Sequence, residues 1–358
     1  MRILLVTDAW HPQVNGVVRT LTTLKSELEA AGHEVIYITP DLFNTVPCPT
    51  YKEIRLALLP GKKMASIIEG FRPCVVHIAT EGTLGVAARK YCVARNVPFT
   101  TAFHTKFPEY LNARFKVPVS WSYKALRWFH GKASNVMVAT QTIEDELVGH
   151  GFKNIKRWSR GVDTDLFRPR DKSFLTLLRP IMLYVGRVAV EKNIEAFLKL
   201  EKPGTKVVVG DGPQLAMLQR KYPDAVFTGA KQGEELARHF AAADVFVFPS
   251  LTDTFGLVLL EALACGVPVA AFPVPGPLDV IGTAPVGCLD HDLSRAIDVA
   301  LKAEPAACRA HAETFSWAAC TAQFLANVRV FDFDAISAGP GPRPTDTSSN
   351  RPAAATAA

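Results

Sequence analysis

Short apolar runs alternate along the chain with segments whose apolar residues recur at helical spacing. The strand-like runs of the first half are Ile3–Thr7, Glu34–Thr39, Cys74–Ala79, Pro98–Phe103 and Asn135–Ala139. After the first run, Val17, Leu21, Leu24 and Leu28 fall on one face of a helix, and Gly32 follows where that helix should end. Strands that alternate with helices predict a parallel sheet with helices on both faces.

The same pattern restarts after the segment RGVDTDLFRP at 160–169. The strands predicted there are Ile181–Val185, Lys206–Val209, Val245–Phe248 and Val267–Phe272, with helices at Glu191–Leu200, Gly212–Lys221 and Gly256–Cys265. Two such series predict two doubly wound α/β domains joined near Gly161–Arg170, which suits a chain of 358 residues. No G-x-G-x-x-G motif follows a predicted strand, so a nicotinamide or flavin site lacks its main signature.

Two segments depart from this alternation. Residues 254–278 imitate a membrane span, because Glu261 is their only charged residue. The turn at Gly266, Val267 and Pro268 divides the segment, so we expect a buried helix and strand and no transmembrane helix. From about Ser337 the chain is rich in Pro, Ser, Thr and Ala without large apolar residues, which predicts a disordered tail.

Composition and charge narrow the class of protein. A hydrophobic fraction of 48% excludes wholesale disorder, and 40 basic residues against 34 acidic ones give a net charge of +6. Residues through Arg168 hold 22 basic and 14 acidic side chains, and the remainder holds 18 and 20, so the first half should meet an anionic partner. Seven scattered cysteines without a C-x-x-C pair, and a start that lacks a signal-peptide pattern, predict free thiols in the cytoplasm.

Two loops after predicted strands of the first half are candidate ligand sites. In the loop Asp8–Gly16, Gly16 has no Cβ and lets the backbone approach a ligand closely. His104 follows the fourth strand, where an imidazole can donate a hydrogen bond or handle a proton. Each has a plainer interpretation: an ordinary turn for the loop and a surface histidine for His104.

The first loop of the second half has the composition of an anion site. Gly186 frees the backbone after a strand, and Arg187 and Lys192 flank the start of a helix, where they can neutralise a diphosphate. The plainer interpretation is a solvated loop in which Glu191 and Glu195 are the ion-pair partners of these cations.

Two later segments add polar groups to the predicted site. The turn VGDGP at 209–213 places Gly210 and Asp211 where they could line a base or ribose pocket, although any tight turn has this composition. The segment 252–271 is more specific, because Glu261 is the only charge of an apolar helix and lies eight residues after Asp253. Burying this carboxylate costs several kcal/mol unless it is hydrogen-bonded, and a pair of ligand hydroxyls would satisfy it.

Together these motifs resemble glycosyltransferase family 4, the large family of retaining GT-B enzymes. The resemblance extends to about Val330 and rests on PQVNGVVRT, FHTKFPEY, RGVDTDLF, GRVAVEKN, VGDGP and the 252–271 segment, in the family's order. The chain looks most like bacterial GDP-mannose-dependent α-mannosyltransferases and glycolipid glycosyltransferases. The resemblance implies two Rossmann-like domains facing a cleft, an acceptor domain at 1–165 and a nucleotide-sugar domain at 166–312. A crossover helix onto the first domain would occupy 313–333, and a disordered tail 334–358.

The resemblance also implies roles for individual residues. His104, Asp253, Arg187 and Lys192 would be catalytic, and Glu261 would hold the ribose hydroxyls. The other donor-binding residues would be Gly16, Gly186, Gly210, Asp211, Phe255, Gly256 and Leu257. The chain departs from the family at Asp253, where relatives have Glu, and at 273–282, where many relatives have a Gly-Gly and a Glu. The family pattern implies neither a metal nor a cofactor; the nucleotide-diphosphate sugar is a co-substrate.

A segment of the basic half has features of a membrane-binding helix. Residues 116–132 interleave aromatic and basic side chains, which suits an anionic bilayer surface, and 62–63 add a basic loop. The alternative is a helix whose aromatic residues pack into the core. The candidate acceptor and membrane residues are Lys62, Lys63, Trp121, Lys124, Arg127 and Trp128.

The sequence therefore predicts a hexosyltransferase of mannose or glucose type. Its partners would be a GDP- or UDP-sugar donor and a lipid or glycolipid acceptor, with peripheral contact to the inner face of an anionic membrane. Nucleic acid is not expected as a partner, since the basic residues accompany no recognition motif. Two alternatives remain open at this point: a nucleotide-sugar epimerase on the same fold, and a sugar-nucleotide-binding protein without catalytic activity.

Overall fold

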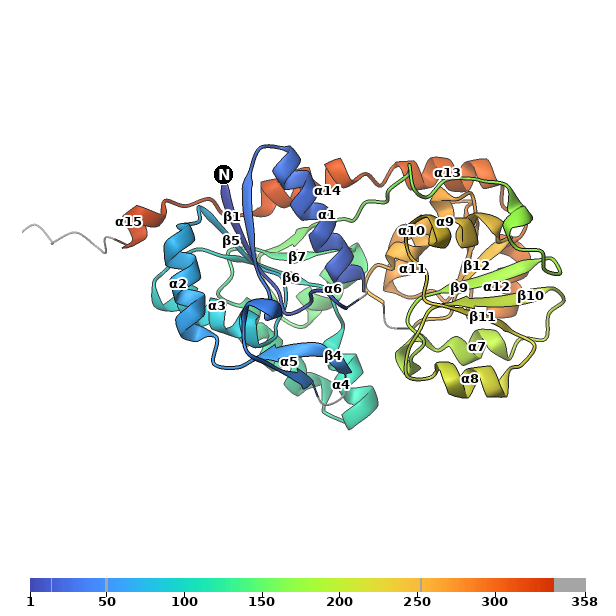
Figure 1. Cartoon of the computed structure of the whole chain (residues 1–358), viewed down its shortest axis with the longest axis horizontal. Coiled ribbons are helices and arrows are strands. Elements are labelled where there is room, and N and C mark those ends of the chain that lie inside the picture. Colours follow the sequence, from blue (N-terminus) through green and yellow to red (C-terminus); the bar gives the residue numbers. More distant parts are fainter. Residues whose placement is uncertain (14, 49–50, 252, 338–358) are drawn as a thin grey trace, which may run out of the picture.

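The chain forms two α/β domains, each built on a parallel sheet (Figure 1). The computed structural model describes residues 1–13, 15–48, 51–251 and 253–337. Helices cover both faces of each sheet, so the fold class predicted from the alternation of strands and helices is confirmed.

The first sheet has the strand order β2-β1-β5-β6-β7-β8. In that order its strands are Glu34–Ile38, Arg2–Val6, Val75–Ile78, Thr100–Phe103, Val136–Val138 and Ile155–Arg157. Its helices are α1 (Gly16–Ala30), α2 (Gly61–Phe71), α3 (Thr83–Ala94), α4 (Phe107–Phe115), α5 (Val119–His130) and α6 (Gln141–Gly149). The hairpin of β3 (Thr45–Cys48) and β4 (Tyr51–Ala57) was not predicted.

The second sheet has the strand order β11-β10-β9-β12-β13-β14. In that order its strands are Val226–Gly229, Thr205–Val209, Ile181–Val185, Val245–Phe248, Val269–Ala271 and Gly287–Leu289. Its helices are α7 (Ile194–Leu198), α8 (Leu215–Lys221), α9 (Gly233–Ala242), α10 (Leu257–Ala264), α11 (Pro275–Val280), α12 (Leu293–Ala300) and α13 (Pro305–Glu313).

Apolar runs form the central strands because both faces of each sheet are covered. In β1, Leu4 contributes to the core on one face of the sheet and Ile3 to the core on the other, and both are fully buried. In β9, Leu183 likewise contributes to the core on one face of its sheet and Met182 to the core on the other. A strand buried on both faces has a continuous apolar sequence instead of an alternating one, which is why these runs were recognisable.

The strand orders define where a ligand is expected. In the first sheet, β2 pairs with one side of β1 and the next strand of the sheet, β5, pairs with the other side. In the second sheet, β10 and β12 flank β9 in the same way. In open α/β sheets ligands bind beyond the carboxyl ends of the strands at such a reversal. The loops after β1 and β9 are those that carry Gly16 and Gly186.

One predicted helix is divided in the structure. The segment predicted as a helix at Glu191–Leu200 is a short 3-10 turn, Val190–Lys192, followed by α7. Asn193 separates them with a φ of 51°, in the left-handed region that asparagine tolerates, and its side chain donates to the Pro249 carbonyl at 3.2 Å. The break fixes Lys192 at the end of the turn, beside the loop that follows β12.

The chain crosses back to the first domain after α13. In Figure 1, α13 covers the second domain and α14 (Trp317–Asn327) lies over the first, beside α1. Phe324 of α14 packs on Trp158 with ring centroids 5.3 Å apart, and Gln323 accepts a hydrogen bond from the Ser159 amide at 2.8 Å.

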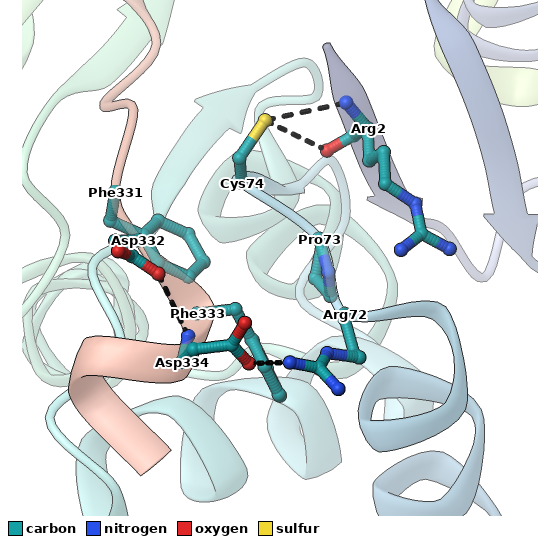
Figure 2. Close-up of a pocket in the computed structure, with 8 residues that line it drawn as sticks. All are labelled: Arg2, Arg72, Pro73, Cys74, Phe331, Asp332, Phe333 and Asp334. Atoms are coloured by element: carbon teal, nitrogen blue, oxygen red, sulfur yellow. Dashed lines mark hydrogen bonds and ion pairs between the residues drawn. The ribbon is translucent and has the colours of Figure 1, made fainter. Parts of the chain in front are cut away.

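The segment after α14 corrects part of the tail prediction. Residues 334–337 lie in α15 (Phe333–Ser337), because Phe331, Phe333 and Ile336 pack against the core of the first domain. A pocket of about 370 Å³ opens there (Figure 2), with Arg72 paired to Asp334 and the Phe331 amide donating to the Cys74 carbonyl at 2.9 Å. None of the predicted site residues lines this pocket. The rest of the predicted tail, 338–358, lies outside the described residues.

The membrane-like segment is a buried helix, turn and strand, as predicted. Its residues form α10, β13 and the start of α11, and α10 is almost wholly buried. Within the part of the chain that the structure describes, no helix is long and apolar enough to span a bilayer. Cys92, Cys265, Cys308 and Cys320 are free thiols, and all four are buried.

Candidate functional site

The two domains meet at the carboxyl ends of their sheets. The Thr254 hydroxyl of the second domain donates to the His104 carbonyl of the first at 2.8 Å. The amide of Gln141, at the start of α6, donates to the Asp279 carboxylate of α11 at 2.8 Å. These contacts hold the end of β6 against the loop that follows β12, and the end of β7 against α11. The region in which the loops of the two domains face each other is called the cleft below.

The loop after β1 is fixed by a buried carboxylate. Asp8 accepts hydrogen bonds from the amides of Leu84 at 2.9 Å and Gly85 at 3.2 Å, and from the Thr80 hydroxyl at 3.0 Å. Burial raises the pKa of Asp8, and these bonds oppose the rise. The loop is therefore anchored to the start of α3, with no ligand needed to hold it.

Gly16 begins α1 on the cleft side of this loop. A Cβ added to Gly16 would come no closer than 3.7 Å to any neighbour, the nearest being Leu257 of the second domain. Packing within the described structure therefore does not require glycine at this position. The contrast is with Gly82, whose Cβ would lie 2.3 Å from the Asp8 carboxyl carbon. Close approach of a ligand remains a reason for glycine at position 16.

His104 presents an unused hydrogen-bonding nitrogen. The Arg160 guanidinium lies 3.1 Å from Nδ1, and Nε2 is buried without a partner among the described residues. Burial first, and then the charge of Arg160, hold the pKa of His104 well below its ordinary value. The ring is therefore neutral, and the residue is half-buried with its Nδ1 already paired.

Lys192 and Asp253 form an ion pair inside the second domain's part of the cleft. Lys192 Nζ lies 2.6 Å from Asp253 Oδ1, and both side chains are mostly buried. Asp253 Oδ2 is buried without a partner in the described residues. The Tyr184 hydroxyl donates to the Arg187 carbonyl at 2.9 Å and fixes the intervening loop. Asp253 lies five residues beyond the end of β12.

Packing explains the glycines of the VGDGP turn. A Cβ on Gly210 would lie 1.8 Å from the Gly186 carbonyl oxygen, and its φ of 154° also favours glycine. These two glycines therefore let the loops after β9 and β10 lie against each other. The Asp211 side chain is exposed and accepts from the Gly212 amide at 2.6 Å. Both predicted residues border the Gly186 loop, without a described contact to the cleft carboxylates.

The start of α10 brings the most specific motif to the cleft. Gly256 precedes the helix with a φ of 82°, a conformation that favours glycine, and no side chain caps the helix. Phe255 is buried and Leu257 faces Gly16 across the cleft. Glu261, one turn further, is 3% exposed, and burial raises its pKa.

Arg19 is a site residue that the sequence analysis missed. It extends from α1 across the cleft and pairs with Glu261 Oε1, with its guanidinium 5.1 Å from the centre of the Phe167 ring. The pair opposes the rise in the pKa of Glu261, and leaves Oε2 buried without a described partner. The available signal was its spacing, since Arg19 lies three residues after Gly16 and so on the same face of α1.

The predicted membrane residues occupy the surface of the first domain. On α5, Trp121 and Trp128 are 71% and 53% exposed, and Lys124 and Arg127 are exposed beside them. Other aromatic residues of the helix, Tyr123 among them, pack into the core, as the alternative interpretation expects. Lys62 and Lys63 lie exposed in the first turn of α2.

Comparison with known proteins gives matches over both domains. The family model "Glycosyltransferase Family 4" matches residues 14–166, and "Glycosyl transferases group 1" matches residues 179–302. A GDP-mannose-dependent alpha-mannosyltransferase of Mycobacterium tuberculosis is 32% identical, covering 83% of this chain and 87% of that protein. An alpha-monoglucosyldiacylglycerol synthase of Streptococcus pneumoniae is 31% identical, covering 85% and 79%.

Solved structures agree on the fold. The sucrose-phosphate synthase of Thermosynechococcus elongatus superposes with a TM-score of 0.73 at 22% identity, covering 91% of this chain and 97% of that one. Two parallel-sheet domains with a shared cleft, matched family models and relatives above 30% identity lead to one assignment. The chain is a GT-B enzyme and belongs to glycosyltransferase family 4.

Proposed function

We propose that the chain is a retaining hexosyltransferase that moves a mannose- or glucose-type sugar from a GDP- or UDP-sugar to a hydroxyl of a membrane lipid or glycolipid. The observation that carries this proposal is a set of buried polar atoms without described partners: His104 Nε2, Asp253 Oδ2 and Glu261 Oε2. They come from both domains, and Thr254 joins the first two by its hydrogen bond to His104. Buried polar groups are normally paired, so a polyhydroxyl ligand in the cleft is the expected partner.

The donor half of this ligand matches the second domain. Glu261 Oε2 can accept from the ribose hydroxyls, while Arg19 stays on the other carboxylate oxygen. Lys192 and Arg187 lie in the loop after β9, where their charges can neutralise the diphosphate and stabilise it as it departs. Electrostatic stabilisation of this kind needs no divalent metal, so we expect EDTA to leave the activity unchanged.

The sugar lies between His104 and Asp253 in this arrangement. The His104 Nε2–H donates to a sugar oxygen, and the free oxygen of Asp253 accepts from a sugar hydroxyl. The bond from the anomeric carbon to the phosphate oxygen breaks, and the acceptor oxygen bonds to that carbon on the same face. The acceptor's proton passes to the departing diphosphate, which makes the leaving group the base.

The first experiment identifies the donor. A bound donor should raise the melting temperature of the purified protein by mass action, in a panel of GDP- and UDP-sugars. The donor that binds is then incubated with a lipid extract, and labelled sugar should move to lipid, with and without EDTA. Lys192→Ala is the control, since it removes a diphosphate contact. An isomerised sugar nucleotide, or binding without transfer, would overturn the proposal.

We also propose that α5 docks the first domain on the inner face of an anionic membrane. Figure 1 places α5 at the side of the first domain away from α14. Trp121 and Trp128 are large apolar side chains exposed to solvent, and Lys124 and Arg127 lie on the same helix. Such a helix surface gains energy from both the interface and anionic lipid headgroups. The relative from Streptococcus pneumoniae is named for the synthesis of a glycolipid, monoglucosyldiacylglycerol, which supports this location.

Liposome sedimentation tests the docking surface. The protein should bind vesicles that contain anionic lipid more strongly than neutral vesicles, and Trp121→Ser combined with Lys124→Glu should remove the difference. Leu178→Ser is the matched control, because Leu178 is equally exposed, at 72%, on the second domain. Equal binding of wild-type protein to both vesicle types, or equal loss in the control, would refute docking through α5.

A further inference from the structure

Arg160 is a buried cation whose described partners are all neutral. It lies in the RGVD segment after β8 and is 4% exposed. Its Nη1 donates to the carbonyl oxygens of Trp158 at 2.6 Å and Ser159 at 2.9 Å, and its Nη2 lies 3.1 Å from His104 Nδ1. The guanidinium also lies 4.3 Å from the centre of the Trp158 ring.

Such a cation is expensive to bury. A charged group without a charged partner costs several kcal/mol in the interior, and burial lowers the pKa of Arg160 to about 10. A neutral donor could satisfy the Trp158 and Ser159 carbonyls. The third contact is to His104, whose ring nitrogen can either donate or accept, so a side chain that only donates has a specific effect at that ring.

The guanidinium decides which nitrogen of His104 carries the proton. Arginine has only donors, so His104 Nδ1 must accept, and the single proton of the neutral ring must be on Nε2. Nε2 is the buried nitrogen without a described partner. His77 and His130 are near enough to lower the pKa of His104 further, and the Trp158 ring packs on the His104 ring with centroids 5.7 Å apart.

We propose that Arg160 is a positioning residue that locks His104 as the neutral tautomer with its Nε2–H directed to the transferred sugar. In the proposed arrangement Nε2–H donates to a sugar oxygen, so the proton has to stay on this nitrogen. An imidazole free to exchange tautomers would present a lone pair to that oxygen for part of the time. The effect of this tautomer on catalysis rests on the proposed sugar transfer, whereas the tautomer of His104 does not depend on that proposal.

The tautomer can be measured without a substrate. Nitrogen-15 NMR of histidine-labelled protein, assigned with His104→Leu, should show a protonated Nε2 and an unprotonated Nδ1 from pH 6 to pH 8. Arg160→Lys keeps a charged donor and should keep this state, whereas Arg160→Met should give a mixture of tautomers. Arg157→Met is the matched control, because Arg157 contacts Gln141 and the Ala139 carbonyl. If Arg160→Met leaves the wild-type tautomer, the proposal is overturned.

A double-mutant cycle then tests whether Arg160 acts through His104. Arg160→Met should lower kcat by more than tenfold with little change in the donor KM, and Arg160→Lys should recover most of it. In a His104→Leu background the same substitution should change kcat by less than twofold. An equal loss in both backgrounds would show that Arg160 acts independently and would overturn the inference. If Arg160→Met does not fold, Arg160→Gln replaces it, since glutamine can still donate to the backbone carbonyls.

A tautomer that follows these expectations in a protein without transferase activity would refute the proposed function alone. Wild-type activity with a mixed tautomer at His104 would refute the positioning role alone.

Discussion

The ion pair between Arg19 and Glu261 gives a prediction with an asymmetric outcome. The Glu261 side chain is 4% exposed and the Arg19 side chain 38% exposed. Removing one partner of a buried pair costs about 3–5 kcal/mol when the remaining charge stays buried. Arg19→Met leaves the buried Glu261 carboxylate without its charged partner. Because water partly reaches the site, we expect the free energy of unfolding to fall by about 2–3 kcal/mol.

The converse substitution should be much milder. Glu261→Gln keeps the shape of the side chain and removes the buried charge, while the exposed part of Arg19 remains hydrated. We expect Glu261→Gln to lower the free energy of unfolding by about 0–1 kcal/mol. The double mutant should lose about 1–2 kcal/mol less than the two single variants lose together. Lys25→Met is the control on the same helix, because Lys25 pairs with Glu29 at 3.8 Å on the surface.

Unfolding at pH 7.5 without nucleotide measures these differences. The melting temperature of Arg19→Met should fall by about 4–12 °C, since about 1 kcal/mol corresponds to 2–4 °C in domains of this size. The loss should shrink at pH 5, because burial already raises the pKa of Glu261 and removal of Arg19 raises it further. A raised carboxyl pKa gives stability at low pH that is lost as pH rises through the folded-state pKa. Equal and additive losses in the two single variants would refute the reasoning.

Three further predictions concern other residues of the cleft and core. Lys192→Ala should lower turnover more than tenfold, about 1.4 kcal/mol, by steady-state kinetics with the identified donor, and near-normal turnover would contradict its assignment. Asp253→Asn should lose at least as much, and Asp253→Glu less, because it keeps the carboxylate that pairs with Lys192; equal losses would mean that the charge is unimportant. Burial lowers the pKa of His77 to about 3, so the folded protein binds fewer protons and loses stability as pH falls below about 6.5. The free energy of unfolding should fall by about 2 kcal/mol less between pH 7 and pH 5 in His77→Gln than in the wild-type protein. An equal fall in both proteins would exclude protonation of His77 as the cause.

Local patterns were sufficient to predict the elements that carry the site. The strands β1, β6 and β9 were identified because burial on both faces demands continuous apolar residues. Short strands at the edges, such as β11 and β14, were missed because three or four partly buried residues carry too little periodicity. The helix at Glu191–Leu200 was predicted without its break, because the left-handed Asn193 depends on a contact with the loop after β12.

The sequence by itself determined the order of strands and helices and the loops that hold polar groups at strand ends. It also singled out Glu261, because one charge in an apolar helix is visible without any partner. Tertiary structure alone decided the pairings. Arg19 is 242 residues from Glu261, Arg160 is 56 from His104, and Lys192 is 61 from Asp253. Their meeting depends on how two sheets and two domains pack, and no local periodicity encodes that packing.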